Sequence, residues 1–474
     1  MKNTFIIISL ALLMGSCSSD EWISLFDGET LDGWTASENA DSWTIEDGAI
    51  ATNGSRSHLY YSGEIKDHNF KNFELLADVK TESHANSGIY FHTEFQEEGW
   101  PVKGYECQVF SSKRNADPGK SENKMTGSIY AVRNTWKSPV EDGEWFRYHI
   151  VVKGKTIFTY INDQLICEYT EPENTYRPAN MPGRLLSSGT FALQCHDPDS
   201  KVYYKNIKVK TLPDDIETPG EAQNDEEFEK LLIDLGAGNF PLVDLHVHLK
   251  RDLTLEAAQA NARKYGFTYG YAVNCGLEMG LETDAEVEEY LASNVLPSHT
   301  WHAMQAEGRE WLDMFSPETI SKFDYAFTDG MTWTNTNGKR MRLWIPEETE
   351  VGDPQDFMEQ LVENIVEILS NEPIDIHVNP TYLPDEISSR YDELWTPERM
   401  DRVIKALVDN QVPLEINCRR RIPSPAYLKR AKEAGVKFTL GTNNAGIDDL
   451  GRMEYALLMV EECGLTRGDM WLPE

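Results

Sequence analysis

The sequence predicts two domains, an all-β jelly-roll sandwich followed by a parallel α/β barrel. Residues 22–212 contain short segments that alternate apolar and polar side chains, and turns with glycine or polar residues separate them. Residues 237–474 alternate short apolar segments with longer amphipathic ones, which is typical of a parallel sheet covered by helices. The length of 474 residues also exceeds what a single domain usually holds.

Residues 1–17 are predicted to be a secretion signal. A basic Lys2 precedes an apolar run from Phe5 to Met14, which is too short to span a bilayer as a permanent helix. Residues 13–17 resemble a bacterial lipobox, which implies that Cys17 carries lipid and becomes the mature N-terminus. The acidic stretch at residues 18–21 resembles the surface-export tag of some Bacteroidetes lipoproteins. We therefore expect a protein anchored by lipid in the cell envelope, at the outer membrane. The alternative is a plain secretory signal in which Cys17 has no role.

The net charge and the cysteine pattern argue against some kinds of binding partner and structural site. The formal net charge of −35 argues against nucleic acid, because phosphate backbones are bound by lysine and arginine. The cysteines after Cys17 form no CxxC pair, which argues against a zinc ribbon. Cys107 and Cys195 fall on apolar strand faces and are predicted to be buried thiols without a disulfide framework.

The predicted strands of the first domain include residues 73–79, 87–91, 105–110, 145–152 and 156–160. Residues 213–236 read as an acidic linker and a helix. The helix is predicted over 225–235, with Asn224 as its N-cap and Gly236 as its C-terminal stop.

Polar side chains are predicted to gather on one sheet face of this domain. Side chains along a strand alternate between faces, so Glu106 and Gln108 share the face opposite Tyr105, Cys107 and Val109. Residues 191–196 show the same split, with the side chains at 194 and 196 on the polar face. A carboxylate, amides and an imidazole converging on one face indicate a site.

A set of motifs in this domain resembles the 3-keto-disaccharide hydrolase domain family. They occur in the order expected for the family: Leu25-Phe-Asp-Gly28, Leu31-Asp-Gly-Trp34, Trp43-x-Ile-Glu-Asp-Gly48, Asn86-Ser-Gly-Ile89, Gly104-Tyr-Glu-x-Gln108, Gly127-Ser-Ile-Tyr130, Leu193-Gln-x-His196 and Asn206-Ile207. The resemblance covers residues 22–212 and implies a lectin-like, concanavalin-like jelly roll. His92 and Lys205 depart from it, since each stands where arginine is common.

The resemblance implies cleavage of glycosides whose sugar carries a ketone at C3. The ketone acidifies the C2 hydrogen, a base removes it, the group at C1 leaves, and water adds back. We expect Glu106 as the base or a metal-ligating carboxylate, His196 as its acid–base partner, and Gln108 as the group that holds the sugar or polarises the ketone. The family chemistry also implies a separate sugar-oxidising enzyme that makes the ketone.

The remaining candidates are expected to bind substrate. Trp100 and Tyr130 are expected to stack on a sugar ring, and His92 and Lys205 to lie near it. Asn86 lies beside them and shapes the turn before Gly88 more than it contacts substrate. The alternatives are a structural carboxylate at position 106, a turn-capping histidine at 196 and core aromatic residues.

The second domain is predicted to contain strands at 242–248, 269–273, 374–378, 414–417 and 437–440. Its predicted helices are 255–265, 284–293, 356–370, 397–410 and 426–434.

Histidines in this domain indicate a divalent metal such as zinc or manganese. His246 and His248 sit two apart at the end of the first barrel strand, which points both the same way. Glu307 and His377 follow later strands and complete the predicted ligand set, with Glu310 as an alternative to Glu307.

This order of residues resembles the PHP family of metal-dependent phosphoesterases and the wider amidohydrolase-like barrels, a distorted TIM-barrel fold. The departures are Asn274-Cys275-Gly276 in place of an Asp-His pair, and Gly441 to Gly446 in place of a final Asp and His. Two alternatives remain: a site with one metal, or a barrel that lost phosphoesterase chemistry.

Three functions remain open from the sequence. The chain is a 3-keto-glycoside hydrolase with an appended barrel, or a lectin-like module tethered to a metal-dependent hydrolase, or a pair of inactive scaffold domains.

Overall fold

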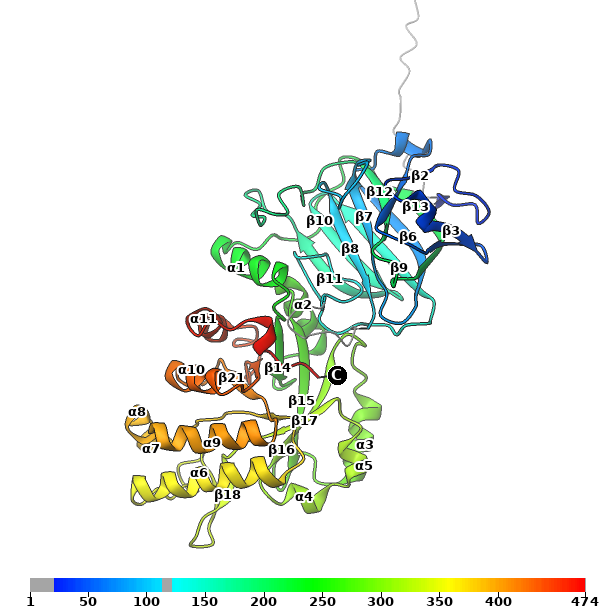
Figure 1. Cartoon of the computed structure of the whole chain (residues 1–474). Helices are drawn as coiled ribbons and strands as arrows, with labels where there is room; N and C mark the ends of the chain where they lie inside the picture. The colour runs from blue at the N-terminus through cyan, green and yellow to red at the C-terminus, as the bar shows by residue number, and fades with distance from the viewer. Residues whose placement is uncertain (1–20, 113–121, 474) are drawn as a thin grey trace, which may run out of the picture.

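The computed structural model describes residues 21–112 and 122–473. Two bodies are visible in Figure 1, a β-sandwich formed by the first part of the chain and an α/β barrel formed by the second. Cys17 and the predicted signal lie outside the described residues, so lipidation stays a prediction. Within the described ranges, no helix combines the length and the apolar character needed to cross a membrane.

The first domain is an antiparallel sandwich, as predicted. In the described ranges one sheet has eight strands, in the order β11-β10-β9-β6-β13-β4-β3 with β1 beside β13, and the other has five, in the order β2-β5-β12-β7-β8. The strands are β1 (Ile23–Ser24), β2 (Trp34–Ala36), β3 (Trp43–Glu46), β4 (Ala49–Thr52), β5 (Ser57–Tyr61), β6 (Phe73–Thr81), β7 (Asn86–Thr93), β8 (Tyr105–Phe110), β9 (Phe146–Lys153), β10 (Thr156–Ile161), β11 (Gln164–Thr170), β12 (Thr190–Cys195) and β13 (Val202–Thr211). Short 3-10 turns lie at Ala40–Ser42 and Ile65–His68.

The alternation in β8 and β12 is confirmed by the packing between the two sheets. Tyr105, Cys107 and Val109 lie in the hydrophobic core of the sandwich, and so do Phe191 and Leu193. The polar side chains of both strands therefore point away from the second sheet, onto the outer face of the five-stranded sheet.

The helix that follows the linker begins and ends later than predicted. Helix α1 spans Glu226–Ala237, and its N-cap is Asp225, whose carboxylate accepts a hydrogen bond from the backbone N–H of Phe228. Gly236 is not a stop. A Cβ at this position would lie 2.7 Å from the Asn134 amide, so the glycine permits a close contact with the sandwich.

The second domain is a nearly closed parallel barrel; its membership of the PHP family is a proposal. Its strands lie in the order β14 (Val243–Val247), β15 (Thr268–Gly276), β16 (Trp301–Glu307), β17 (Tyr325–Thr328), β20 (Ile376–His377), β21 (Leu414–Asn417) and β22 (Phe438–Gly441). The end of β22 lies beside β14, where the backbone N–H of Asn443 donates to the carbonyl of His246 at 2.9 Å. A hairpin of β18 (Thr332–Thr334) and β19 (Arg340–Arg342) stands outside this sheet.

Helices cover the outside of the barrel (Figure 1). They are α2 (Leu255–Tyr265), α3 (Asp284–Ser293), α4 (Trp311–Met314), α5 (Pro317–Ile320), α6 (Pro354–Asn371), α7 (Asp385–Ser388), α8 (Tyr391–Leu394), α9 (Pro397–Asp409), α10 (Pro425–Glu433) and α11 (Glu454–Glu462), followed by a 3-10 turn at Arg467–Asp469. The predicted bounds of α2 and α3 are confirmed, and those of α6, α9 and α10 differ by one or two residues.

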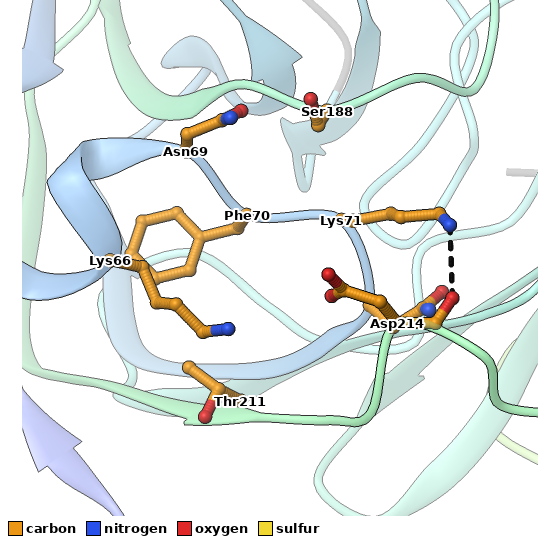
Figure 2. A pocket seen from close by; sticks show the side chains of 8 residues that line it. Lys66, Asn69, Phe70, Lys71, Ser188, Thr211 and Asp214 are labelled. Carbon is orange, nitrogen blue, oxygen red and sulfur yellow. Dashed lines mark hydrogen bonds between the residues drawn. The ribbon is translucent and has the colours of Figure 1, made fainter. Parts of the chain in front are cut away.

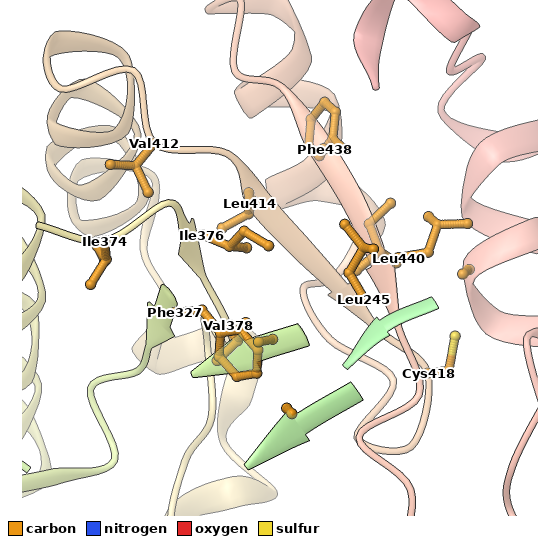
Figure 3. Close-up of a cluster of buried hydrophobic side chains, with 14 of the residues drawn as sticks. Leu245, Phe327, Ile374, Ile376, Val378, Val412, Leu414, Cys418, Phe438 and Leu440 are labelled. Atoms are coloured by element: carbon orange, nitrogen blue, oxygen red, sulfur yellow. The ribbon is translucent and has the colours of Figure 1, made fainter. Parts of the chain in front are cut away.

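The barrel core is built from side chains of many strands. Figure 3 shows Leu245 of β14, Phe327 of β17, Ile376 of β20 and Leu440 of β22 packed together. Leu245 and Val247 are buried in this core, so the intervening His246 points to the other side of β14.

Candidate active site

A cavity of about 390 Å³ lies on the polar face of the five-stranded sheet. Six of the residues predicted from the sequence line it: Asn86, Trp100, Glu106, Gln108, Tyr130 and His196. They come from β7, β8, β12 and the loops beside them. The structure therefore brings the two predicted acid–base residues into one cavity, together with the amide expected to hold the sugar.

Glu106 is buried at the floor of the cavity and both of its carboxylate oxygens are hydrogen-bonded. Oε2 accepts from Arg184 Nη2 at 2.8 Å, and Oε1 accepts from Gln194 Nε2 at 2.9 Å. Both oxygens are thus engaged by neighbouring side chains, the one by a buried guanidinium and the other by an amide. The contacts therefore favour Glu106 as the group that orients Arg184.

Arg184 is the main site residue that the sequence reasoning missed. It comes from the loop between β11 and β12, and its guanidinium lies 5.4 Å from the ring centre of Tyr90 and 5.6 Å from that of Tyr130. Burial would lower the Arg184 pKa, but the Glu106 carboxylate outweighs burial and raises it. Arg184 stays charged. Strand alternation does not extend into loops, so no pattern in the sequence marked this arginine.

Three residues that line the cavity each have a buried polar atom without a hydrogen-bond partner among the described residues. These atoms are Arg184 Nη1, a donor, and Gln108 Oε1 and Gln194 Oε1, both acceptors. Each amide is oriented by its other end, since Gln108 Nε2 donates to Asn86 Oδ1 at 2.9 Å and Gln194 Nε2 donates to Glu106. Buried polar groups are almost always satisfied, so this donor and these two acceptors can be completed by a polar ligand or by water.

His196 lies at the rim of the same cavity and is paired with its neighbour. Its Nδ1 lies 2.7 Å from Asp197 Oδ2, and about a third of its side chain is exposed. A carboxylate on one ring nitrogen fixes the orientation of an imidazole and leaves the other nitrogen available for a substrate proton. His196 is therefore better placed than Glu106 to take a proton.

An aromatic platform borders the opening of the cavity. Trp100 is 42% exposed, and its ring centre lies 5.0 Å from that of His196 and 5.6 Å from that of His58 beneath it. The Arg56 guanidinium lies 5.2 Å from the same ring. An exposed indole held on one face offers the other face to the C–H surface of a sugar ring.

Tyr130 forms part of the cavity wall with Glu122, which the sequence reasoning did not identify. The Tyr130 hydroxyl donates to Glu122 Oε2 at 3.0 Å. Burial, and then the Glu122 carboxylate, raise the pKa of Tyr130, so its hydroxyl stays protonated.

His92 and Lys205 are not among the residues that line this cavity, so their predicted placement was wrong. His92 is buried and hydrogen-bonded to the carbonyl of Lys71, because its φ of 55° and a register shift between β7 and β12 interrupt the alternation there. Lys205 belongs to β13 of the other sheet, where its Nζ lies 3.8 Å from the ring centre of Trp145.

A smaller cavity, of about 130 Å³, lies elsewhere on the sandwich (Figure 2). Its lining includes Lys66, Lys71, Asn72 and Asp214. Asn72 uses both ends of its amide within the protein, and Lys71 Nζ donates to the carbonyl of Asp214 at 2.9 Å. This cavity contains none of the predicted site residues.

The histidines predicted to bind metal lie in a buried polar cluster inside the barrel. His246 Nδ1 lies 2.6 Å from Glu415 Oε1, and its Nε2 lies 3.2 Å from Gln305 Oε1. His248 Nδ1 meets the carbonyl of Ala272 at 3.0 Å. Both histidines are thus oriented by hydrogen bonds within the protein.

The other two predicted ligands stay apart from this pair. Glu307 Oε1 accepts from Gln305 and Asn274, while Glu307 Oε2 and both nitrogens of His377 have no partner among the described residues. Burial lowers the pKa of His377 to about 4. Glu310 is paired with Arg340 and does not replace Glu307.

The four predicted ligands therefore do not fit a metal as they are arranged. Gln305 stands between His246 and Glu307 and hydrogen-bonds to both. Among residues 21–112 and 122–473, no group of three or more His, Cys, Asp or Glu side chains is arranged to hold a metal ion. A zinc or manganese site at these residues stays a prediction.

Comparisons with known proteins point to the same domain as the cavity. Residues 21–210 match the family described as 3-keto-alpha-glucoside-1,2-lyase-like domain. The chain is also similar to a 3-keto-disaccharide hydrolase of Bacteroides thetaiotaomicron, with 28% identity over 232 residues, which is 41% of this chain and 79% of the relative. The first domain is thus 3-keto-disaccharide hydrolase-like.

Two solved structures are each similar to part of the chain. A "putative glycosyl hydrolase" from Parabacteroides distasonis is 25% identical and covers 40% of this chain and 94% of its own, with a TM-score of 0.36. A histidinol phosphate phosphatase from Lactococcus lactis is 12% identical and covers 49% of this chain and 99% of its own, with a TM-score of 0.32. These structural similarities carry no argument about function.

Proposed function

We propose that the first domain is a hydrolase or lyase that cleaves glycosides of sugars oxidised to a ketone at C3. The similarity of residues 21–210 to a 3-keto-alpha-glucoside-1,2-lyase-like domain supports the substrate class. The observation that carries the proposal is a cavity with the His196–Asp197 pair at its rim and an unpartnered guanidinium N–H of Arg184 at its floor. One group accepts a proton, and the other donates to a developing oxyanion.

The proposed reaction begins when His196 removes the proton from C2 of the sugar. The electrons of the C2–H bond move toward the C3 ketone and form an enolate, whose negative oxygen is stabilised by Arg184 Nη1. The enolate re-forms its carbonyl as the C1–O bond breaks, and the leaving oxygen takes up the proton that His196 removed from C2. Addition of water across the C1–C2 double bond then restores the 3-keto sugar, so the net change is hydrolysis.

The other cavity residues bind and orient the sugar in this proposal. Gln108 and Gln194 each direct an amide oxygen at hydroxyl groups, and Trp100 stacks on the ring. Glu106 holds the guanidinium of Arg184 in place through their 2.8 Å contact. No step of this proposal goes through a metal.

The chemistry of the proposed substrate indicates which reaction must produce it. A sugar with a ketone at C3 arises by two-electron oxidation of the C3 hydroxyl, so we propose a sugar-oxidising enzyme as a pathway partner. A lipid anchor at Cys17 in the cell envelope stays part of the proposal.

The test offers the purified protein a 3-keto-disaccharide and its unoxidised parent, with and without a chelator. We expect cleavage of the keto sugar alone, and His196→Ala should lower kcat by about 10²- to 10⁴-fold because it removes the general base. His149→Ala is the matched control, since this histidine also contacts a carboxylate, Glu74 at 3.1 Å, but lies on the other sheet. His246→Ala tests whether the barrel cluster contributes.

Three outcomes would overturn the assignments. Equal cleavage of both sugars would exclude elimination from a ketone, and binding of both sugars without cleavage would support the lectin-like alternative. If Glu106→Gln abolishes cleavage while His196→Ala retains it, the base is Glu106, as the sequence predicted.

A further inference from the structure

One segment of the sandwich connects the sugar cavity to the barrel. Residues 122–137 begin at the cavity wall and lie beside β8, where the backbone N–H of Tyr130 donates to the carbonyl of Glu106 at 2.9 Å. The segment ends in the second domain. Trp136 is buried among the core side chains of the barrel, and its backbone N–H donates to Thr268 Oγ1 at 3.0 Å.

A buried lysine lies at the start of this segment. Lys124 is fully buried, its Nζ lies 2.9 Å from Glu122 Oε1, and it also donates to the side-chain oxygen of Asn239. The same Nζ lies 4.3 Å from the ring centre of Tyr130. A buried ammonium requires such partners, because burial alone strongly disfavours the charge.

Asn239 belongs to the second domain, since it lies between α1 and β14. It contacts the segment twice, because its carbonyl also accepts from Asn123 Nδ2 at 3.1 Å. The contacts therefore run from Asn239 to Lys124, from Lys124 to Glu122, and from Glu122 to the hydroxyl of Tyr130 at 3.0 Å. Glu122 and Tyr130 both line the sugar cavity.

We propose that Lys124 is a positioning residue for the sugar site and that Asn239 of the second domain holds it in place. This inference rests on the proposed function and deepens it. Lys124 fixes Glu122 and Tyr130 in the cavity wall without touching the sugar. The wall takes its working position only when the barrel is docked, which gives the second domain a role in the first domain's chemistry.

The test compares two variants of the full chain that each remove one contact between the domains. Asn239→Gly removes the side-chain oxygen that accepts the hydrogen bond from Lys124. Glycine adopts the φ of 63° found at this position without strain. Lys137→Met removes the contacts of Lys137 Nζ with the Thr300 carbonyl and Asp324, away from the cavity. We expect Asn239→Gly to lower kcat for the 3-keto-disaccharide about tenfold, since small misplacements are costly. KM should stay within about twofold, because Trp100, which stacks on the sugar ring, lies outside this chain of contacts.

A second readout does not depend on activity. The protein is labelled with 3-fluorotyrosine, and the ¹⁹F resonance of Tyr130 is identified by its loss in Tyr130→Phe. We expect this resonance to shift in Asn239→Gly and in the double variant Lys124→Met/Glu122→Gln, which removes both buried charges together, and to stay in place in Lys137→Met.

The two readouts separate the inference from the proposed function. An unshifted Tyr130 resonance in Asn239→Gly, or an equal loss of kcat in Asn239→Gly and Lys137→Met, would overturn the role of Lys124. If the unaltered protein cleaves no 3-keto-glycoside, the proposed function fails, and the resonance of Tyr130 still decides whether Asn239 positions the wall.

Discussion

His58 is a buried histidine whose protonation makes the stability of the folded protein depend on pH. It lies beneath Trp100, and neither of its ring nitrogens has a partner among the described residues. Burial, reinforced by the nearby Arg56, lowers its pKa from 6.5 to about 3. The folded protein therefore holds His58 neutral at pH values where the unfolded chain binds a proton.

The free energy of unfolding should consequently fall as the pH drops from about 6.5 toward 3. Because the pKa of His58 is lower in the folded protein, the unfolded chain binds the proton first as the pH falls. Between the two pKa values, this histidine lowers the free energy of unfolding by about 1.4 kcal/mol per pH unit. His58→Phe should flatten the dependence by that amount in urea titrations between pH 7 and pH 4. Tyr60→Phe, on the same strand, is the control and should keep the slope. An unchanged slope in His58→Phe would contradict the low pKa.

At the scale of elements, the pairing of β7 with β8 makes room for the site. Gly88 lies opposite Gln108 in the register of the two strands, next to Glu106 on the cavity side. A Cβ at Gly88 would lie 2.7 Å from Glu106 Oε1. The carboxylate has little freedom to move away, since Arg184 and Gln194 hold it.

Gly88→Ala should therefore disturb the site more than the fold. We expect kcat/KM for the keto sugar to fall about tenfold through displacement of the Glu106–Arg184 pair, with a melting temperature lowered by a few degrees. Steady-state kinetics and calorimetry measure the two effects. Gly446→Ala is the control, because a Cβ there meets its nearest atom at 3.4 Å. Full activity in Gly88→Ala would show that Glu106 can move without consequence.

Helices and strands with a regular pattern of apolar residues could be predicted from the sequence. Strands that are very short, or that mix polar and apolar residues irregularly, could not. The bounds of β8, β21, α2 and α3 agree with the prediction. The strands β16 and β17 were not predicted, because Trp301–Glu307 mixes polar and apolar residues and Tyr325–Thr328 is only four residues long.

At the scale of the whole molecule, the two domains share a buried side chain. Trp136 comes from the sandwich and is 1% exposed within the barrel core. Its indole N–H contacts the carbonyl of Gly266, and the neighbouring Arg133 pairs with Glu229 of α1 at 2.7 Å. The domains are therefore expected to unfold as one unit.

Trp136→Ala should separate their unfolding. The substitution leaves a cavity in the barrel core and should cost about 3–5 kcal/mol. We expect the single calorimetric transition to split or to shift strongly downward, with the barrel losing more stability than the sandwich. Trp145→Ala is the control, because Trp145 is 40% exposed and directly precedes β9 of the eight-stranded sheet. An unchanged single transition in Trp136→Ala would show that the domains unfold independently of this contact.

The sequence by itself determined which side chains each strand presents to either face, and the family resemblance pointed to the domain that contains the cavity. Glu106, Gln108 and His196 could be placed on one face because alternation along a strand depends only on local backbone geometry. Only the tertiary structure decided that Arg184 neutralises Glu106, that Asn239 reaches Lys124 from the other domain, and that His92 turns away. These features depend on loops, on a register shift and on contacts between segments far apart in the sequence. Local periodicity contains no information about any of the three, so it could not predict them.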